Sequence, residues 1–216
     1  MFLFDMDGTL LDSNGVWKEV DREFLRRRGL EYTRAYYAGV AHTIFPLAAK
    51  FTKEFCGLSE SCEEIMAEWM DLAKDAYAHV TVKAGVRAYL KQCKAEGRKM
   101  AVVTSSVPEH CYTALENLDL LKYFDGITFA QELGLEKKNP EVWLEAAKRS
   151  GERPEDCTIF DDSLAACQGA RRAKMRVVGV YDGFFASDER EMRQFCDVYI
   201  KSFEELLYVP MPKRKK

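Results

Sequence analysis

A short apolar run near the start of the chain, Phe2-Leu3-Phe4, is followed at once by two acidic residues two positions apart. A strand that is buried on both faces of a parallel sheet reads as such a continuous apolar run. Ligands of open α/β sheets bind beyond the carboxyl ends of the strands. We therefore expect Asp5 and Asp7 to face a cleft, where a turn at Gly8 lets both carboxylates reach one substrate.

Two other structures are compatible with this segment. Asp and Gly are common turn formers, so a plain acidic turn has the same composition. A calcium-binding EF-hand loop also begins with alternating acidic residues, but it needs Glu at its twelfth position. Counted from Asp5, that position holds Val16. Because short motifs give false positives, a catalytic site requires further polar groups downstream.

Composition and charge limit the class of protein. The 216 residues suffice for one domain with an insert or for two small domains, and a hydrophobic share of 47% supports a substantial core. The formal net charge of -3 gives no electrostatic reason to expect a nucleic-acid partner. The basic end, Lys213-Arg214-Lys215-Lys216, is typical of a solvated tail rather than of a localisation or membrane signal.

Cysteine usage and the N-terminal segment predict a cytoplasmic protein. The 7 cysteines are odd in number and form no Cys-x-x-Cys pair, which indicates a reduced protein. The N-terminal segment has no basic region, and Asp5 and Asp7 interrupt its apolar stretch. A signal peptide, a membrane span and a membrane partner are therefore not expected.

A change in hydrophobic period divides the chain. From about residue 13 to residue 77 the pattern is helical with no convincing strand. Gly29 and Gly57 follow two of the amphipathic stretches as helix ends, and Ser61 with Glu64 has the spacing of a capping box. This part of the chain predicts a small antiparallel bundle of helices.

The rest of the chain alternates short β-like runs with helical stretches, which predicts a parallel sheet with crossover helices. Helices are expected from Gly85 to Gly97, from Pro108, from Pro140 with Asn139 as N-cap, and from Ser163 to Ala173; further strands are expected at 100–103, 126–130, 157–160 and 177–180. The prediction is an α/β fold, a doubly wound parallel sheet with an inserted α-helical bundle. The sheet domain comprises residues 1–14 and 80–208, the helical domain 15–79, and the basic tail 209–216.

Polar groups follow three of the predicted strands. Asp5 follows the first, Thr104-Ser105-Ser106 the second, and Asp161-Asp162 the fourth, while Lys137 precedes the Pro140 helix. Catalytic groups gather at the carboxyl ends of parallel strands, so these residues should lie close together. They would supply a nucleophile, a second acid, donors for an anion and carboxylates for a hard cation.

These elements, in this order, resemble the haloacid dehalogenase superfamily of phosphohydrolases over nearly the whole chain, to about Leu207. The run Asp5-Met6-Asp7-Gly8-Thr9-Leu10-Leu11-Asp12-Ser13 is highly specific to that superfamily, and Phe160-Asp161-Asp162-Ser163-Leu164-Ala165 strengthens the match. A helical insert directly after the first motif is similar to the subgroup of β-phosphoglucomutase and phosphoglycolate phosphatase. The resemblance implies a Rossmann-like core with a helical cap domain.

The resemblance implies that Asp5 attacks phosphorus and forms an aspartyl-phosphate intermediate. Asp7 would protonate the leaving oxygen and then take a proton from the hydrolytic water. This role requires the pKa of Asp7 to be raised by neighbouring carboxylates and by burial under the cap.

The same resemblance implies a Mg²⁺ ion held by the carboxylates of Asp5 and Asp162 and by the main-chain carbonyl of Asp7. Asp161 would bind the ion directly or through water. Asp161-Asp162 has an alternative role as the N-cap of the following helix, and the two roles are compatible.

Hydroxyl groups of Thr104 and Ser105 would bind the phosphoryl group, and Lys137 would offset its charge. The family usually shows Lys-Pro-x-Pro at the lysine motif, whereas this chain has Lys137-Lys138-Asn139-Pro140. The distance to Pro140 favours Lys137, and Lys138 stays an alternative.

An acid at Asp7 favours phosphate esters over the dehalogenase and phosphonate chemistries of the superfamily. Trp17 stands where the cap linker of β-phosphoglucomutase carries a histidine, and Ala41-His42-Thr43 stands where its cap presents an arginine. Both departures disfavour a mutase. Trp17 and His42 are candidate substrate contacts from the cap, with a packing role and a surface position as their respective alternatives.

The predicted function is that of a Mg²⁺-dependent phosphatase of a small phosphorylated metabolite, active as a monomer or weak homodimer. A sugar phosphomutase and a non-catalytic phosphate-binding regulatory module are the alternatives. The metabolite is not specified, because its choice depends on cap residues whose positions over the cleft do not follow from the sequence.

Overall fold

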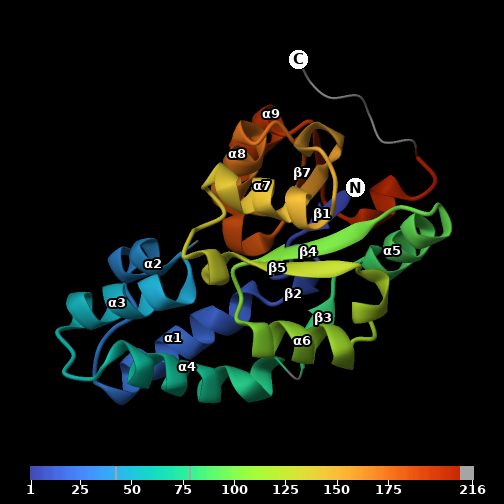
Figure 1. Ribbon diagram of the computed structural model, residues 1–216. Helices are drawn as coiled ribbons and strands as arrows, with labels where there is room; N and C mark the ends of the chain where they lie inside the picture. The colour runs from blue at the N-terminus through green and yellow to red at the C-terminus, as the bar shows by residue number, and fades with distance from the viewer. Residues whose placement is uncertain (42, 78, 210–216) are drawn as a thin grey trace.

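A six-stranded parallel sheet forms the centre of the protein (Figure 1). The computed structural model describes residues 1–41, 43–77 and 79–209. The strand order is β5-β4-β1-β6-β7-β8, and every neighbouring pair is parallel. The strands are β1 (Phe2–Phe4), β4 (Met100–Thr104), β5 (Gly126–Phe129), β6 (Thr158–Asp161), β7 (Arg176–Val180) and β8 (Val198–Ile200). Because β1 pairs with both β4 and β6, the polar residues at and just beyond the carboxyl ends of these three strands meet at one edge.

Helices cover both faces of the sheet, which confirms the predicted doubly wound α/β fold. Alternate residues of β1 face opposite sides, so Phe4 packs in the cluster with α5 and α6, whereas Leu3 packs in the cluster with α7 and α8. Figure 1 shows α7, α8 and α9 above the sheet and α6 below it. These helices are α5 (Val86–Ala95), α6 (Pro108–Asn117), α7 (Pro140–Arg149), α8 (Leu164–Arg172) and α9 (Glu189–Phe195).

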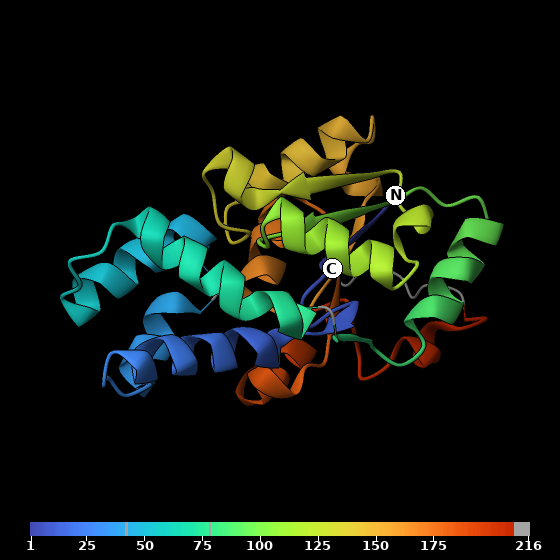
Figure 2. The same cartoon turned by 90° about the horizontal axis from the view of Figure 1, so that it is seen from below.

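Four further helices form a unit to one side of the sheet (Figures 1 and 2). They are α1 (Asn14–Arg27), α2 (Arg34–Val40), α3 (Phe45–Cys56) and α4 (Cys62–Tyr77). α4 packs against α1 and α3, and α3 packs against α2. The unit is inserted between β2 (Leu11–Asp12) and β3 (Thr81–Val82), which pair as an antiparallel ribbon.

Several predicted helix ends are confirmed. The Ser61 amide donates to Glu64 Oε2 at 2.7 Å and the Glu64 amide donates to Ser61 Oγ at 3.1 Å, which is the reciprocal pattern of a capping box. Gly57 ends α3 with a φ of 64°, a left-handed conformation that glycine adopts without a steric penalty. Asn139 caps α7 by accepting the Glu141 amide at 3.0 Å.

The alternative N-cap role of Asp161-Asp162 is wrong. Asp161 is the last residue of β6, and the N-cap of α8 is Ser163, whose side chain accepts the Ala166 amide. Four short features were also not predicted: α2, α9, β8 and the β2–β3 ribbon. Each has too few residues to show a hydrophobic period of its own.

The helices found among residues 1–41, 43–77 and 79–209 are all too short or too polar to cross a membrane.

Candidate active site

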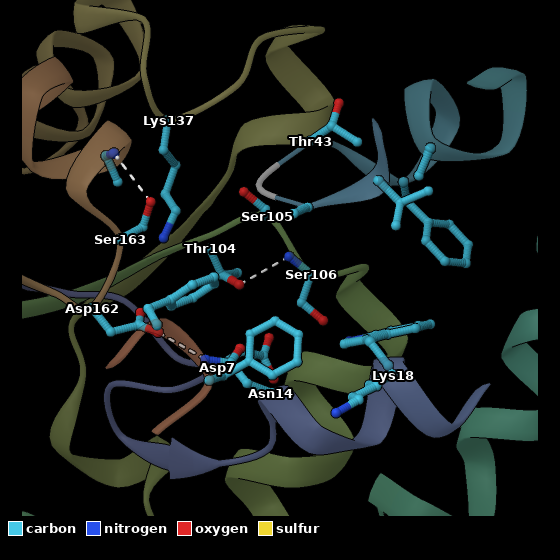
Figure 3. A pocket seen from close by; sticks show the side chains of 18 of the residues that line it. Asp7, Asn14, Lys18, Thr43, Thr104, Ser105, Ser106, Lys137, Asp162 and Ser163 are labelled. Carbon is cyan, nitrogen blue, oxygen red and sulfur yellow. Dashed lines mark hydrogen bonds between the residues drawn. The ribbon is translucent and has the colours of Figure 1, made fainter. Parts of the chain in front are cut away.

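A single cavity brings most of the predicted site residues together (Figure 3). It lies between the carboxyl ends of the central strands and helices α1–α4, and its empty volume is about 1160 Å³ including the opening to solvent. Figure 3 shows Thr104, Ser105, Lys137 and Asp162 around one space with Asp7. The predicted residues in its lining are Asp5, Asp7, Trp17, Thr104, Ser105, Lys137 and Asp162.

Lys137 connects the nucleophile candidate to the acidic pair at the end of β6. Its Nζ donates to Asp5 Oδ1 at 2.5 Å and to Asp161 Oδ2 at 2.8 Å, and all three side chains are buried. Burial alone would lower the pKa of Lys137, but the charges of Asp161 and Asp5 outweigh it and hold that pKa above its ordinary value. The ammonium group therefore stays charged beside Asp5.

Both Lys137 and Lys138 line the cavity, but only Lys137 bonds Asp5 and Asp161, and the backbone around it explains this difference. Trp143 Nε1 donates to the Lys137 carbonyl oxygen at 2.8 Å, and a Cβ on Gly169 would lie only 2.2 Å from that oxygen. The loop thus rests directly on α8, where only glycine leaves room. Lys138, in contrast, pairs with Glu136 and its side chain is 65% exposed. The geometry supports Lys137 over Lys138.

Asp5, Asp161 and Asp162 form a buried acidic cluster. Each offers a carboxylate oxygen, and these oxygens all lie within 4.8 Å of one another. Burial, followed by the charges of Asp5 and Asp161, raises the pKa of Asp162 well above its usual range. Burial likewise raises the pKa of Asp161 to about 6. Three carboxylates with one ammonium leave excess negative charge, which fits a small hard cation such as Mg²⁺.

Two donors, one in the first motif and one directly after it, orient Asp162. Thr9 Oγ1 donates to Asp162 Oδ1 at 3.2 Å, and Asn14 Nδ2 donates to Asp162 Oδ2 at 2.7 Å. A Cβ on Gly8, which has a φ of 80°, would lie 2.2 Å from the same carboxylate. The N-terminal segment therefore supports the acidic pair at the end of β6 as well as its own carboxylates.

Asp7 is held apart from the acidic cluster, toward the helical unit. Its Oδ1 accepts hydrogen bonds from Ser13 Oγ at 2.6 Å and from the Tyr77 hydroxyl at 2.7 Å. Loss of hydration raises the pKa of Asp7 to about 6, with a further contribution from the charge of Asp5 and an opposing one from the Ser13 bond. A carboxyl group of this pKa can both give and take a proton near neutral pH.

Hydroxyl groups after β4 line the same cavity. Thr104 is buried at the end of the strand, and its Oγ1 accepts the Ser106 amide at 2.9 Å. This bond uses a lone pair of the oxygen, so the hydroxyl proton of Thr104 stays available to an anion. Ser105 also lines the cavity.

Of the two residues predicted to contact substrate from the helical insert, Trp17 and His42, the structure describes only Trp17. Trp17 lines the cavity, and its ring contacts Phe45 and Tyr77 with centroids 5.4 and 5.8 Å away. It therefore packs against α3 and α4 while facing the site. His42 lies outside the described residues; its neighbour Thr43 lines the cavity and donates to Glu136 Oε1 at 2.6 Å.

Sequence reasoning missed Tyr77, Asn14 and the role of Ser13. Tyr77 lies 70 residues from Asp7, and Asn14 lies 148 residues from Asp162. No local spacing connects residues so far apart in the chain. Ser13 belonged to the recognised motif, but the motif alone does not say which carboxylate its hydroxyl contacts.

Sequence comparisons identify related proteins over nearly the whole chain. A family described as haloacid dehalogenase-like hydrolase matches residues 2–180. The phosphorylated carbohydrates phosphatase of Thermotoga maritima is 26% identical over 209 residues, covering 96% of each chain. Fructose-1-phosphate phosphatase YqaB of Escherichia coli is 29% identical over 187 residues, covering 82% of this chain and 94% of the relative.

Solved structures share the fold. A β-phosphoglucomutase from Clostridium difficile matches with a TM-score of 0.81 at 20% identity, covering 96% of this chain and 92% of that one. CbbY from Rhodobacter sphaeroides, solved in complex with phosphate, matches with a TM-score of 0.79 at 19% identity and covers 95% of both chains.

Proposed function

Because the chain belongs to the haloacid dehalogenase-like hydrolase family and is a phosphoric monoester hydrolase, we propose that it is a Mg²⁺-dependent phosphatase that works through an aspartyl-phosphate intermediate. The substrate is a small phosphorylated metabolite. The observation that carries the proposal is the shared cavity of the buried Asp5–Lys137 pair and the second acid Asp7.

In the first step, a carboxylate oxygen of Asp5 attacks phosphorus as the bond to the leaving oxygen breaks. Lys137 engages Asp5 Oδ1, which leaves the other oxygen for the attack. The ammonium group and the Thr104 hydroxyl offset the charge on the phosphoryl oxygens. A bound Mg²⁺ would neutralise further charge, and Asp5, Asp161 and Asp162 are the residues that would hold it.

Asp7 handles both protons of the cycle. It gives a proton to the leaving oxygen, and then takes one from the water that attacks the phosphorylated Asp5. With a pKa of about 6, roughly one carboxyl group in ten is protonated at pH 7. That fraction is large enough for the first transfer, while the ionised majority suits the second.

We propose that residues 15–79 act as a cap domain over a core of residues 1–14 and 80–208. Support comes from the insertion of α1–α4 between β2 and β3 and from their share of the cavity wall. A cap of this kind excludes bulk water and selects the leaving group.

Phosphorylated sugars are the first substrates to test, because two relatives are named for phosphorylated carbohydrates and fructose 1-phosphate. The test is a phosphate-release screen over sugar phosphates and other small phosphate esters, with and without Mg²⁺. We expect Mg²⁺-dependent release that is lost in Asp5→Asn and kept in Asp119→Asn, a matched change at an exposed surface carboxylate.

Three results would contradict the proposal. Activity that survives in Asp5→Asn would exclude this residue as the nucleophile. Binding of phosphate analogues without any release would indicate a regulatory module. Conversion of one sugar phosphate into another with little phosphate loss would indicate a mutase.

A further inference from the structure

Tyr77 connects the helical unit to the proposed acid and base. Its hydroxyl donates to Asp7 Oδ1 at 2.7 Å, and Trp17 Nε1 donates to the same hydroxyl oxygen at 2.8 Å. Because the indole N–H occupies a lone pair of that oxygen, the hydroxyl proton is directed at Asp7. A chain of two directed hydrogen bonds therefore ends on the carboxyl group.

The Tyr77 ring has little freedom to leave this arrangement. The side chain is only 1% exposed, and the ring stacks on His110 with centroids 4.7 Å apart and planes at 19°. Trp17 contacts the ring at 61° and His110 at 43°, so three rings fix one another. The hydroxyl is thus held in place by packing as well as by hydrogen bonds.

The two donors to Asp7 come from different sides but meet on the same oxygen. Ser13 Oγ and the Tyr77 hydroxyl both bond Oδ1, which leaves Oδ2 as the oxygen for proton transfer. Two bonds from different directions on one oxygen restrict the rotation of the carboxyl group. Proton transfer requires hydrogen-bond reach in the correct direction, so this rotation affects its rate.

We infer that Tyr77 is a positioning residue, which holds Asp7 so that Oδ2 faces the leaving oxygen. The inference rests on the proposed phosphatase function. Tyr77 is the last residue of α4, whereas Asp7 follows β1. The nucleophile is held by Lys137 from the core, whereas one of the two bonds that hold the acid comes from the helical unit, so the acid is fully aligned only when that unit is in place.

A comparison of substrates with different leaving groups distinguishes this positioning role from a purely structural one. An alkoxide is strongly basic and needs a proton to depart, whereas 4-nitrophenolate is weakly basic and departs with little protonation. A misaligned acid should therefore slow alkyl phosphates selectively. The ratio kcat/KM is the correct measure, because it covers only the steps up to departure of the leaving group and excludes the later attack of water.

The experiment compares Tyr77→Phe with the wild type on a sugar phosphate that the wild type hydrolyses and on 4-nitrophenyl phosphate. We expect kcat/KM to fall about 10- to 100-fold on the sugar phosphate, a part of the 10²- to 10⁴-fold that general acid catalysis supplies. On 4-nitrophenyl phosphate, kcat/KM should stay at the wild-type value, whereas kcat should fall because Asp7 also activates the water.

Tyr36→Phe is the matched control. Tyr36 is a buried tyrosine of α2 whose hydroxyl bonds Asp21 at 3.1 Å and Thr52 at 3.0 Å, so the change removes an equivalent hydroxyl from the helical unit. It should lower thermal stability without changing the ratio between the two substrates.

An equal fall on both substrates, or no fall on either, would overturn the inference. If Tyr77→Phe shows no cooperative melting, Trp17→Phe replaces it, because this change removes the N–H that directs the Tyr77 hydroxyl. We then expect a smaller selective fall in kcat/KM on the sugar phosphate. The absence of that selective fall would overturn the inference. A wild-type protein that releases phosphate from neither substrate would instead refute the proposed function.

Discussion

Asp21→Asn should stabilise the protein more at pH 8 than at pH 5. Asp21 lies on α1 inside the helical unit, where it is 8% exposed and accepts a hydrogen bond from the Tyr36 hydroxyl at 3.1 Å. Burial raises the pKa of this carboxyl group to about 7. Asparagine keeps the acceptor for Tyr36 and removes the ionisable group.

The direction of this pH dependence follows from whether the folded or the unfolded state binds more protons. In the unfolded chain the carboxyl group has an ordinary pKa, so it loses its proton near pH 4, whereas the folded protein keeps it until about pH 7. Between these values the folded state binds more protons, and stability falls as pH rises. Below this window the group costs nothing, and above it the full cost of a buried charge remains.

The size of the stability difference depends on how much of the pH range between the unfolded and folded pKa values the two measurements span. Between pH 5 and pH 7, an interval of two pH units, the wild type loses about 2.7 kcal/mol of unfolding free energy, at 1.36 kcal/mol per unit. The asparagine side chain cannot ionise, so the variant escapes this loss. For a protein of this size, the difference corresponds to roughly 5 to 10 °C in Tm.

The assay is thermal or urea unfolding of both proteins at pH 5 and pH 8. Taking the difference between pH values cancels any constant effect of the new amide, such as an unsatisfied N–H. Asp71→Asn, at an exposed position of α4, controls for general changes in surface charge. A stability difference between Asp21→Asn and wild type that is the same at both pH values would refute the reasoning, and so would one that is larger at pH 5.

Three further changes test the site. Lys137→Met should lower kcat roughly 10²- to 10³-fold, as loss of a charge-stabilising donor does, with Lys138→Met nearly unchanged in the same phosphate-release assay. Gly169→Ala should cost about 1 to 3 kcal/mol in urea unfolding because its Cβ would lie 2.2 Å from the Lys137 carbonyl oxygen, whereas Gly15→Ala, with nothing within 4 Å, should not destabilise. Mg²⁺ at a hundred times its Kd should stabilise the wild type by about 2.7 kcal/mol in the same measurement, and Asp162→Asn should abolish most of that gain.

The parallel sheet with crossover helices and the residues at the carboxyl ends of its strands could be predicted, because both depend on local pattern. The apolar run before Asp5 and the run before Asp161 each identify a buried strand, and the rule that ligands bind beyond strand ends places the two carboxylates together. The distance from Pro140 was also sufficient to favour Lys137, which the Trp143 and Gly169 contacts now explain.

The remaining features depend on contacts between distant segments. The bond from Tyr77 to Asp7 spans 70 residues and follows from how α4 returns to the core, which no spacing within α4 encodes. Strand β8 has only 3 residues, and β3 has only 2, so their identity comes from the partners beside which they lie. Ser163 took the N-cap position because β6 continues through Asp161 and leaves the helix to start later.

The pairing of β2 with β3 has a consequence for how such proteins diversify. Asp12 lies opposite Thr81 and Leu11 opposite Val82, so the chain leaves the core and re-enters it at neighbouring points. A segment whose two ends are adjacent can be lengthened, exchanged or shortened to a tight turn without moving the strands that carry Asp5, Thr104 and Asp161. Substrate preference can therefore evolve as a separable module, while the phosphoryl-transfer chemistry is inherited intact.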